Sequence, residues 1–114
     1  MEFTASMKNN YEFRRLYSKG RFASTPLMAV YVRKNRTRRN KLGLTVSTKL
    51  GNAVVRNRIR RRLREIYRLH EQEILPGFDI VVVGRSAISK ADYHRMETDF
   101  LRLAEKLGLK ADMA

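Results

Sequence analysis

The segment LGLTVSTKLGNAVVRNRIRRRLREIYRLH, residues 42–70, changes from a strand pattern to a helix pattern across one short turn. In residues 42–48, apolar side chains recur at every second position, which is typical of a strand with one buried face. After Gly51 and Asn52, apolar residues recur over residues 53–70 at the spacing of an amphipathic helix. The apolar stripe consists of Val55, Ile59, Leu63, Ile66 and Tyr67. The segment therefore predicts a strand followed by a long helix.

Two further stretches predict neighbouring strands. Residues 78–84 (FDIVVVG) form a near-continuous apolar run, which is typical of a buried central strand. Residues 27–33 are rich in β-branched and aromatic side chains and follow a proline, as expected of another strand. The basic turn at 34–41 would join this strand to the one at 42–48.

Helices are expected near both ends of the chain. Residues 8–19 and 89–107 carry apolar side chains at helical spacing. The order of helix, strands, helix, strand and helix predicts a single α+β domain over residues 1–114, with helices packed on one sheet. We expect residues 1–7 and 109–114 to be flexible.

The basic residues are concentrated in the middle of the chain. The protein has 114 residues, with 25 Lys and Arg against 11 Asp and Glu, and a net charge of +14. Residues 33–68 contain 14 of these basic residues and a single acid, Glu65. Positive charge concentrated in one segment indicates that a defined surface of the protein binds a nucleic acid.

The composition excludes several other classes of site. The chain has no cysteine, which rules out disulfides, thiolate metal sites and thiol nucleophiles. No secretory leader is recognisable near the N-terminus, and no apolar run approaches the roughly 20 residues that span a bilayer. We therefore expect a cytoplasmic protein with no membrane partner.

No pattern in the sequence predicts catalysis by the protein alone. The two histidines, His70 and His94, have no obvious metal-ligating partners, and we expect both on the surface. The acidic residues are scattered singly, whereas metal-dependent nucleases need clustered carboxylates. We therefore expect neither a catalytic residue nor a metal site on this chain.

The helix at 53–70 carries a row of arginines beside its apolar stripe. Arg56, Arg60 and Arg64 follow one another at four-residue spacing, and Arg68 borders the same row. Like charges at this spacing disfavour an isolated helix by roughly 0.2–0.5 kcal/mol per pair, a cost that a bound polyanion would offset. Arginine also suits bidentate contact with phosphate. The alternative is a solvated surface, which would normally mix charges of both signs.

Aromatic residues are a second candidate for RNA binding. Phe13 and Tyr17 lie four residues apart on the expected first helix, and Tyr31 lies on the first expected strand. Unpaired RNA bases commonly stack on aromatic rings beside a basic groove. Spacing alone favours core positions for these rings, so the residues by themselves leave both roles open.

The turn and the arginine helix form one long, gapless motif. It consists of GNAV at 51–54, RNR at 56–58 and Arg61, and it is accompanied by residues 12–20 and 79–85. Together these stretches resemble the bacterial ribonuclease P protein component over roughly residues 8–105. A match of this length is far more specific than a short motif.

The resemblance implies a fold more specific than α+β. It is a two-layer α/β sandwich with about four strands and three helices, shared with a domain of a small-subunit ribosomal protein. The strand–helix–strand crossover, here about 42–84, would be left-handed, against the usual right-handed rule.

The resemblance also implies two RNA-binding sites. The first lies on the arginine helix and would contact a catalytic RNA; it comprises Arg56, Asn57, Arg58, Arg60, Arg61, Arg64 and Arg68. The second is a cleft between the sheet and the first helix for the single-stranded 5′ leader of precursor tRNA. This cleft and its surroundings comprise Phe13, Tyr17, Tyr31, Ser47, Lys49 and Arg85.

The implied function is that of the protein subunit of ribonuclease P, an endoribonuclease that removes the leader to give the mature tRNA 5′ end. The RNA subunit would carry out the cleavage with Mg²⁺ held by RNA phosphates. The protein, a monomer within the ribonucleoprotein, would bind the leader and neutralise charge. The alternatives are a ribosomal or ribosome-assembly protein, a helix-based DNA-binding module and a protein-only nuclease.

Overall fold

The structure, a computed structural model, describes residues 1–111 of the chain. Five strands form one sheet in the order β1-β4-β5-β3-β2. Their bounds are Thr4–Ser6 (β1), Arg21–Ser24 (β2), Met28–Lys34 (β3), Asn40–Thr45 (β4) and Phe78–Gly84 (β5). The pairs β1·β4 and β4·β5 are parallel, whereas β2·β3 and β3·β5 are antiparallel.

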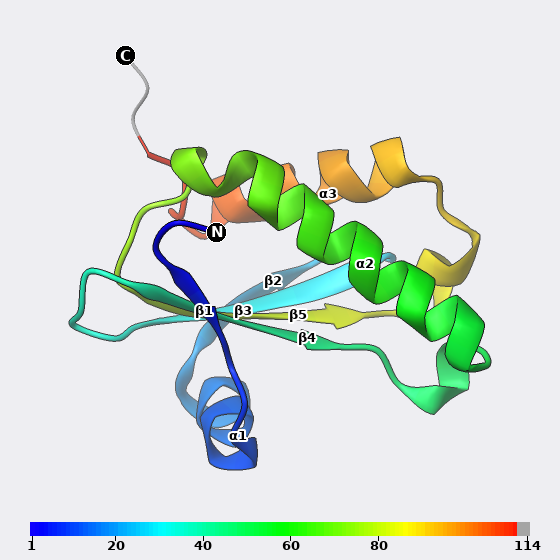
Figure 1. Cartoon of the computed structure of the whole chain (residues 1–114), viewed down its shortest axis with the longest axis horizontal. Helices are drawn as coiled ribbons and strands as arrows, with labels where there is room; N and C mark the ends of the chain where they lie inside the picture. The colour runs from blue at the N-terminus through cyan, green and yellow to red at the C-terminus, as the bar shows by residue number, and fades with distance from the viewer. Residues whose placement is uncertain (112–114) are drawn as a thin grey trace.

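Three α-helices cover the two faces of this sheet. They are α1 (Asn10–Lys19), α2 (Ala53–His70) and α3 (Tyr93–Lys106). Three short 3₁₀ helices lie between the larger elements: η1 (Thr48–Leu50), η2 (Glu71–Glu73) and η3 (Ser86–Lys90). Figure 1 shows α2 and α3 on one face of the sheet and α1 alone on the other. The α1 helix therefore leaves part of its face of the sheet uncovered.

The central strand β5 is buried on both of its faces, which explains its unbroken apolar sequence. Ile80 and Val82 belong to the large core beneath α2 and α3. Val81, between them in the chain, belongs to a second, smaller core with Leu16 of α1 and Met7. Successive side chains of a strand point to opposite faces, so one apolar strand supplies both cores.

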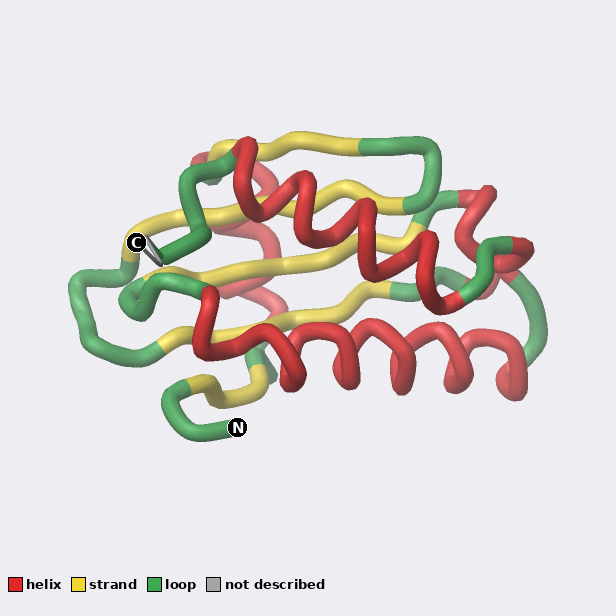
Figure 2. Tube along the Cα trace, turned by 90° about the horizontal axis from the view of Figure 1, so that it is seen from above, coloured by secondary structure: helices red, strands yellow, loops and turns green. Residues whose placement is uncertain are grey.

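The crossover from β4 through α2 to β5 is left-handed. The two strands are parallel neighbours, and Figure 1 shows α2 running back above them. In Figure 2, which looks down from the helix side, β5 lies to the left of β4 when both strands are turned to point upward. The expectation from the family resemblance is confirmed.

The α2 helix forms where the sequence predicts it and for the expected reasons. Asn52 caps its N-terminus, and its side-chain oxygen accepts a hydrogen bond of 3.0 Å from the Val55 amide. The predicted apolar stripe contacts the sheet, and Ile59, Leu63 and Ile66 are all buried. Burial of each such side chain contributes about 1.5–3 kcal/mol relative to exposure.

The α+β class is confirmed, with three differences in detail. The sheet has five strands rather than about four, because the short edge strands β1 and β2 carry no pattern long enough to recognise. The α1 helix packs on the face opposite α2 and α3, which adds a partial third layer (Figure 1). The last helix begins at Tyr93 rather than residue 89, because Asp92 caps it by accepting a 2.7 Å hydrogen bond from the Arg95 amide.

Parts of both ends of the chain contact residues that are distant in the sequence. The carboxylate of Glu71 accepts hydrogen bonds from the amides of Glu2 (2.7 Å) and Phe3 (3.3 Å), just before β1. Leu109 is buried, and its carbonyl accepts a 2.7 Å hydrogen bond from the Leu75 amide. Contacts between residues so distant in sequence leave no local pattern. Residues 112–114 of the expected flexible end lie outside the described residues.

A buried polar network joins α2 to the start of β4. The Asn40 side chain is fully buried, and its amide nitrogen donates to Tyr67 Oη and to the Leu75 carbonyl, each at 3.1 Å. Its oxygen accepts from the Phe78 amide at 2.8 Å. Tyr67 Oη, which accepts from Asn40, can then donate to Thr4 Oγ1 at 2.9 Å. Asn40 and Tyr67 together therefore link α2, β1 and the beginning of β5 through hydrogen bonds.

Replacing this asparagine should destabilise the protein. Asn40→Ala would leave the Phe78 amide and the Leu75 carbonyl without these partners, and each unsatisfied buried group costs about 1–3 kcal/mol. We expect the free energy of unfolding in urea to fall by at least about 2 kcal/mol. The control is Asn10→Ala, at an exposed position, which should change the free energy of unfolding little. A similar, small change for both variants would show that the network is not structural.

Candidate nucleic-acid interface

The arginines of α2 form a surface beside its buried stripe, which we call the arginine face. It comprises Arg56, Arg58, Arg60, Arg61 and Arg64, together with Asn57. Arg60 Nη1 donates to Asn57 Oδ1 at 3.2 Å, so these two predicted residues lie against each other. Arg68 differs, because it forms a two-point ion pair with Glu65 at 2.6 and 3.0 Å. The arginine face thus ends one turn before Arg68.

A hollow at the edge of the sheet links the arginine face to α1. Its volume is about 410 Å³, and its wall includes Arg60 and Arg64 of α2, Phe13 of α1 and Leu44 of β4. It exists because β1 pairs with β4 only as far as Leu42, which leaves the rest of that edge uncovered. The arginine face and Phe13, which were predicted to belong to two separate sites, therefore line the same hollow.

An aromatic cleft lies on the other side of Phe13. It has a volume of about 440 Å³ and is lined by Asn10, Phe13, Arg14, Tyr17 and Thr45. The Tyr17 hydroxyl is 3.0 Å from Thr45 Oγ1 on β4, which ties the helix to the strand at this point. We use the name aromatic cleft for this hollow and for the rings that adjoin it.

The adjoining rings form a continuous cluster. Tyr31 packs edge-to-face on Tyr17, with ring centroids 5.1 Å apart, and stacks on Phe22 at 5.2 Å. Phe22 is 61% exposed and Tyr17 is 42% exposed, so both offer ring surface to solvent. Edge-to-face and stacked rings of this kind hold one another in place. The sequence predicted Tyr17 and Tyr31 here but missed Phe22, because β2 is too short to be recognised as a strand.

A glycine on β4 makes room for the Phe13 ring. A Cβ atom at Gly43 would lie 2.6 Å from Phe13 Cε1, closer than two carbon atoms can approach. Gly43 is the strand neighbour of Val81, which in turn pairs with Tyr31 and then Phe22. The missing side chain lets the ring lie against the sheet at the end of this row.

The three remaining predicted residues lie beyond the carboxyl ends of the parallel strands. Ser47 caps η1, with its hydroxyl accepting from the Lys49 amide at 3.3 Å, and both side chains are exposed. Arg85 follows β5, and its guanidinium donates to the Thr25 carbonyl at 3.2 Å. None of the three lines the two hollows.

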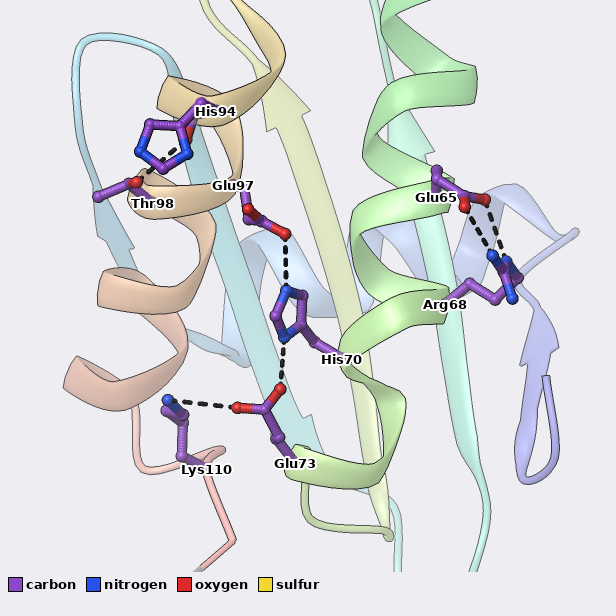
Figure 3. A network of polar contacts seen from close by, with 8 residues as sticks. All are labelled: Glu65, Arg68, His70, Glu73, His94, Glu97, Thr98 and Lys110. Carbon is purple, nitrogen blue, oxygen red and sulfur yellow. Dashed lines mark hydrogen bonds and ion pairs between the residues drawn. The ribbon is translucent and has the colours of Figure 1, made fainter.

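The C-terminal end of α2 is held by a histidine between two carboxylates (Figure 3). His70 Nε2 lies 2.8 Å from a carboxylate oxygen of Glu97 on α3, and Nδ1 contacts Glu73. Burial by itself would lower the pKa of His70, but the hydrogen bonds to Glu97 and Glu73 outweigh it and raise the pKa. His70 is therefore a link between α2 and α3 rather than the surface residue that the sequence suggested. Within residues 1–111, no three His, Cys, Asp or Glu side chains are grouped to hold a metal ion.

No described helix is long and apolar enough to cross a membrane.

The histidine link should make stability depend on pH. Because the pKa of His70 is raised above 6.5 in the folded protein, its stabilising contribution is complete below that value and is lost as the pH rises through the folded pKa. We expect the free energy of unfolding to decrease between about pH 6 and about pH 9, and to decrease less in His70→Gln. Urea unfolding across this range measures both. His94→Gln is the control; identical pH profiles for His70→Gln and the wild type would contradict the link.

Comparison with known proteins places these features in a family. Residues 1–108 match the family model described as Ribonuclease P. The ribonuclease P protein component of Natranaerobius thermophilus is 36% identical over 109 residues, covering 96% of this chain and 95% of the relative. That of a Thermoanaerobacter species is 40% identical over 105 residues, covering 92% and 90%.

Solved structures agree with the sequence matches. The RNase P protein of Staphylococcus aureus has a TM-score of 0.86 at 31% identity, covering 93% of this chain and 97% of that chain. The RNase P protein from Thermotoga maritima has a TM-score of 0.82 at 29% identity, covering 90% and 96%.

Proposed function

The chain belongs to the ribonuclease P protein family, and from this membership we propose that its two surfaces bind two different RNAs. As a member of the family it is a subunit of an endoribonuclease that processes tRNA. We assign the arginine face to the catalytic RNA and the aromatic cleft to the 5′ leader of precursor tRNA. Mature tRNA, which lacks the leader, would not occupy the cleft.

One observation carries this assignment: Phe13 lines both hollows. On one side the Phe13 ring faces the aromatic cleft, and on the other it shares a wall with Arg60 and Arg64. A strand stacked in the aromatic cleft would therefore lie next to whatever polyanion the arginine face holds. Aromatic rings beside a basic surface are the usual means of binding single-stranded RNA.

The proposed role of the arginine face is electrostatic rather than catalytic. Arg58, Arg61 and Arg64 are exposed and, within the described residues, none of them is paired with an acid. Guanidinium groups placed between two RNAs would reduce their mutual repulsion. We propose that Mg²⁺ is held by the RNA partner, where it would stabilise the charge that develops at the cleaved phosphodiester. The protein residues then act by binding and orienting RNA.

The remaining parts of the proposal follow from the same assignment. The relatives are bacterial proteins, and we place the complex in the cytoplasm, where tRNA precursors are made. We also propose that the protein enters the ribonucleoprotein as a monomer. Its exposed aromatic and basic surfaces would then be covered by RNA rather than by a second copy of the chain.

Loss of two arginines should be most harmful when Mg²⁺ is scarce. Arg60→Gln with Arg64→Gln removes charge from the shared wall, and a hydrogen bond to a charged group contributes about 1.5–3 kcal/mol. We expect precursor cleavage by the reconstituted holoenzyme to fall by about tenfold or more at low Mg²⁺ and to recover as Mg²⁺ is raised. Arg102→Gln with Lys106→Gln on α3 is the charge-matched control. An equal loss at every Mg²⁺ concentration would contradict the charge-neutralising role.

Loss of the Phe13 ring should weaken binding of precursor tRNA alone. A base stacked on an aromatic ring contributes about 1–3 kcal/mol, so Phe13→Ala should reduce precursor affinity by about tenfold. Phe13→Leu keeps most of the volume above Gly43 and guards against misfolding, and it should show the same selective loss. Holoenzyme binding to precursor and mature tRNA is the measurement. A parallel loss for both tRNAs would rule out the leader-binding cleft.

A further inference from the structure

The α1 helix divides its face of the sheet into two flanks. One flank is the aromatic cleft, which is centred on Phe13 and Tyr17. The other flank lies over the row of paired residues Lys41, Asp79 and Arg33. On this face of the sheet, that row is next to the row of Gly43, Val81 and Tyr31. It continues into the loop between β3 and β4, which Figure 1 shows at the end of the sheet opposite the N-terminus of α2. The proposed function uses only the first flank.

We call the second flank the far-flank surface and define it by its basic and aromatic residues. Tyr11, Arg15, Arg33, Lys34, Arg36 and Arg39 line its hollows, and the exposed Arg38 lies on the same loop between β3 and β4. Two hollows of about 400 and 380 Å³ adjoin here, and Arg15, Asn35 and Asp79 line both. The surface is therefore concave, unlike a row of charges on a convex loop.

Of the two acids within the far-flank surface, Glu12 is paired with a lysine and Asp79 accepts a hydrogen bond from an asparagine. Glu12 is buried and forms an ion pair of 2.5 Å with Lys41, and the hydrogen bond from Lys41 lowers the pKa of Glu12. Asp79 Oδ1 accepts from Asn35 Nδ2 at 3.0 Å. Within residues 1–111, neither Arg15 nor Arg36 forms an ion pair. Their charge is left for an outside anion.

The loop that carries three of the arginines is held in one conformation. Asn35 Nδ2 donates to the Arg39 carbonyl at 2.9 Å, and Asn35 Oδ1 accepts from the Thr37 amide at 2.9 Å. Arg36 has φ of 60°, a left-handed conformation that few residues other than Gly, Asn and Asp adopt readily. A loop held this way presents its guanidinium groups without a large ordering cost on binding.

An exposed ring lies on the same surface. Tyr11 is 54% exposed, and the Arg15 guanidinium lies 5.8 Å from its ring centroid. An aromatic ring beside an arginine offers stacking for an unpaired base and a contact for its phosphate. This combination favours single-stranded RNA over a duplex, whose bases are not free to stack.

We propose that the far-flank surface is a second site for single-stranded RNA, which holds the distal part of the same leader whose proximal part lies in the aromatic cleft. The inference rests on the proposed function of that cleft. Arg14 lines the aromatic cleft and the adjacent Arg15 lines the far flank, so the two sites meet across the outer surface of α1. A helix with its side chains is only about 10–12 Å across, a distance that a few nucleotides span.

The test compares precursor tRNAs with leaders of roughly 4 and roughly 16 nucleotides, the range of lengths that one single-strand binding domain covers. The variant is Arg36→Asn, Arg38→Gln and Arg39→Gln in one chain. Asparagine is chosen at position 36 because it tolerates the left-handed backbone there. The measurement is the Kd of each precursor for the holoenzyme reconstituted with a bacterial ribonuclease P RNA, at several salt concentrations.

We expect the long leader to bind the wild-type holoenzyme at least several-fold more tightly than the short one. The triple variant should lose this gain and keep wild-type affinity for the short leader. The slope of log Kd against log salt for the long leader should fall by about 2, since each phosphate neutralised on a single strand contributes about 0.7. The control, Arg95→Gln with Arg102→Gln and Lys106→Gln on α3, removes the same charge and should leave the gain intact.

Three results would overturn the inference: no gain from the longer leader, a gain that survives in the triple variant, or an equal loss for both leaders. The last result would assign the surface to the catalytic RNA. Phe13→Leu, measured with the short leader, separates this inference from the proposed function. If Phe13→Leu weakens binding of the short-leader precursor while the triple variant keeps the gain in affinity from the longer leader, only the far-flank inference fails. If Phe13→Leu has no effect on the short leader, the aromatic cleft fails and the inference with it.

Discussion

The burial of β5 on both faces determines how the helices must cover the sheet. Ile80 and Val82 require the cover of α2 and α3, and Val81 requires the cover of α1. A single ten-residue helix cannot cover a five-stranded sheet. The uncovered area on either side of α1 becomes two surfaces, one aromatic and one basic. The surfaces available for RNA are therefore consequences of how the core is closed.

The arrangement of charge depends on the same packing. The apolar stripe of α2 lies against the sheet, so its arginines line the sides of the helix, and Arg60 and Arg64 meet Phe13 at the open edge of β4. The like-charged row opposes helix formation, whereas the buried stripe favours it by several kcal/mol. The protein can therefore keep a concentrated positive field in a stable helix, and an RNA partner would lower the remaining repulsion.

Local patterns in the sequence predicted the elements with strong periodicity and missed those built by distant contacts. The alternation at 42–48 predicted β4, the apolar run at 78–84 predicted the central strand β5, and the apolar stripe predicted α2. The β1 strand was missed because it is held by Glu71 and by pairing with β4. For the same reason Phe22 was missed, since only the stacking on Tyr31 shows that it belongs to the aromatic cleft. The family resemblance supplied the left-handed crossover, which no local pattern could predict.

We propose that this chain assists an RNA that performs the cleavage. The most direct test is cleavage of precursor tRNA at low Mg²⁺ by a bacterial ribonuclease P RNA, with and without the protein. We expect the protein to stimulate cleavage by the RNA and to cleave nothing by itself. If the folded, RNA-binding protein gives no stimulation, it does not assist the RNA; if the protein alone cleaves and an acid-to-amide substitution abolishes that cleavage, the protein itself is the catalyst.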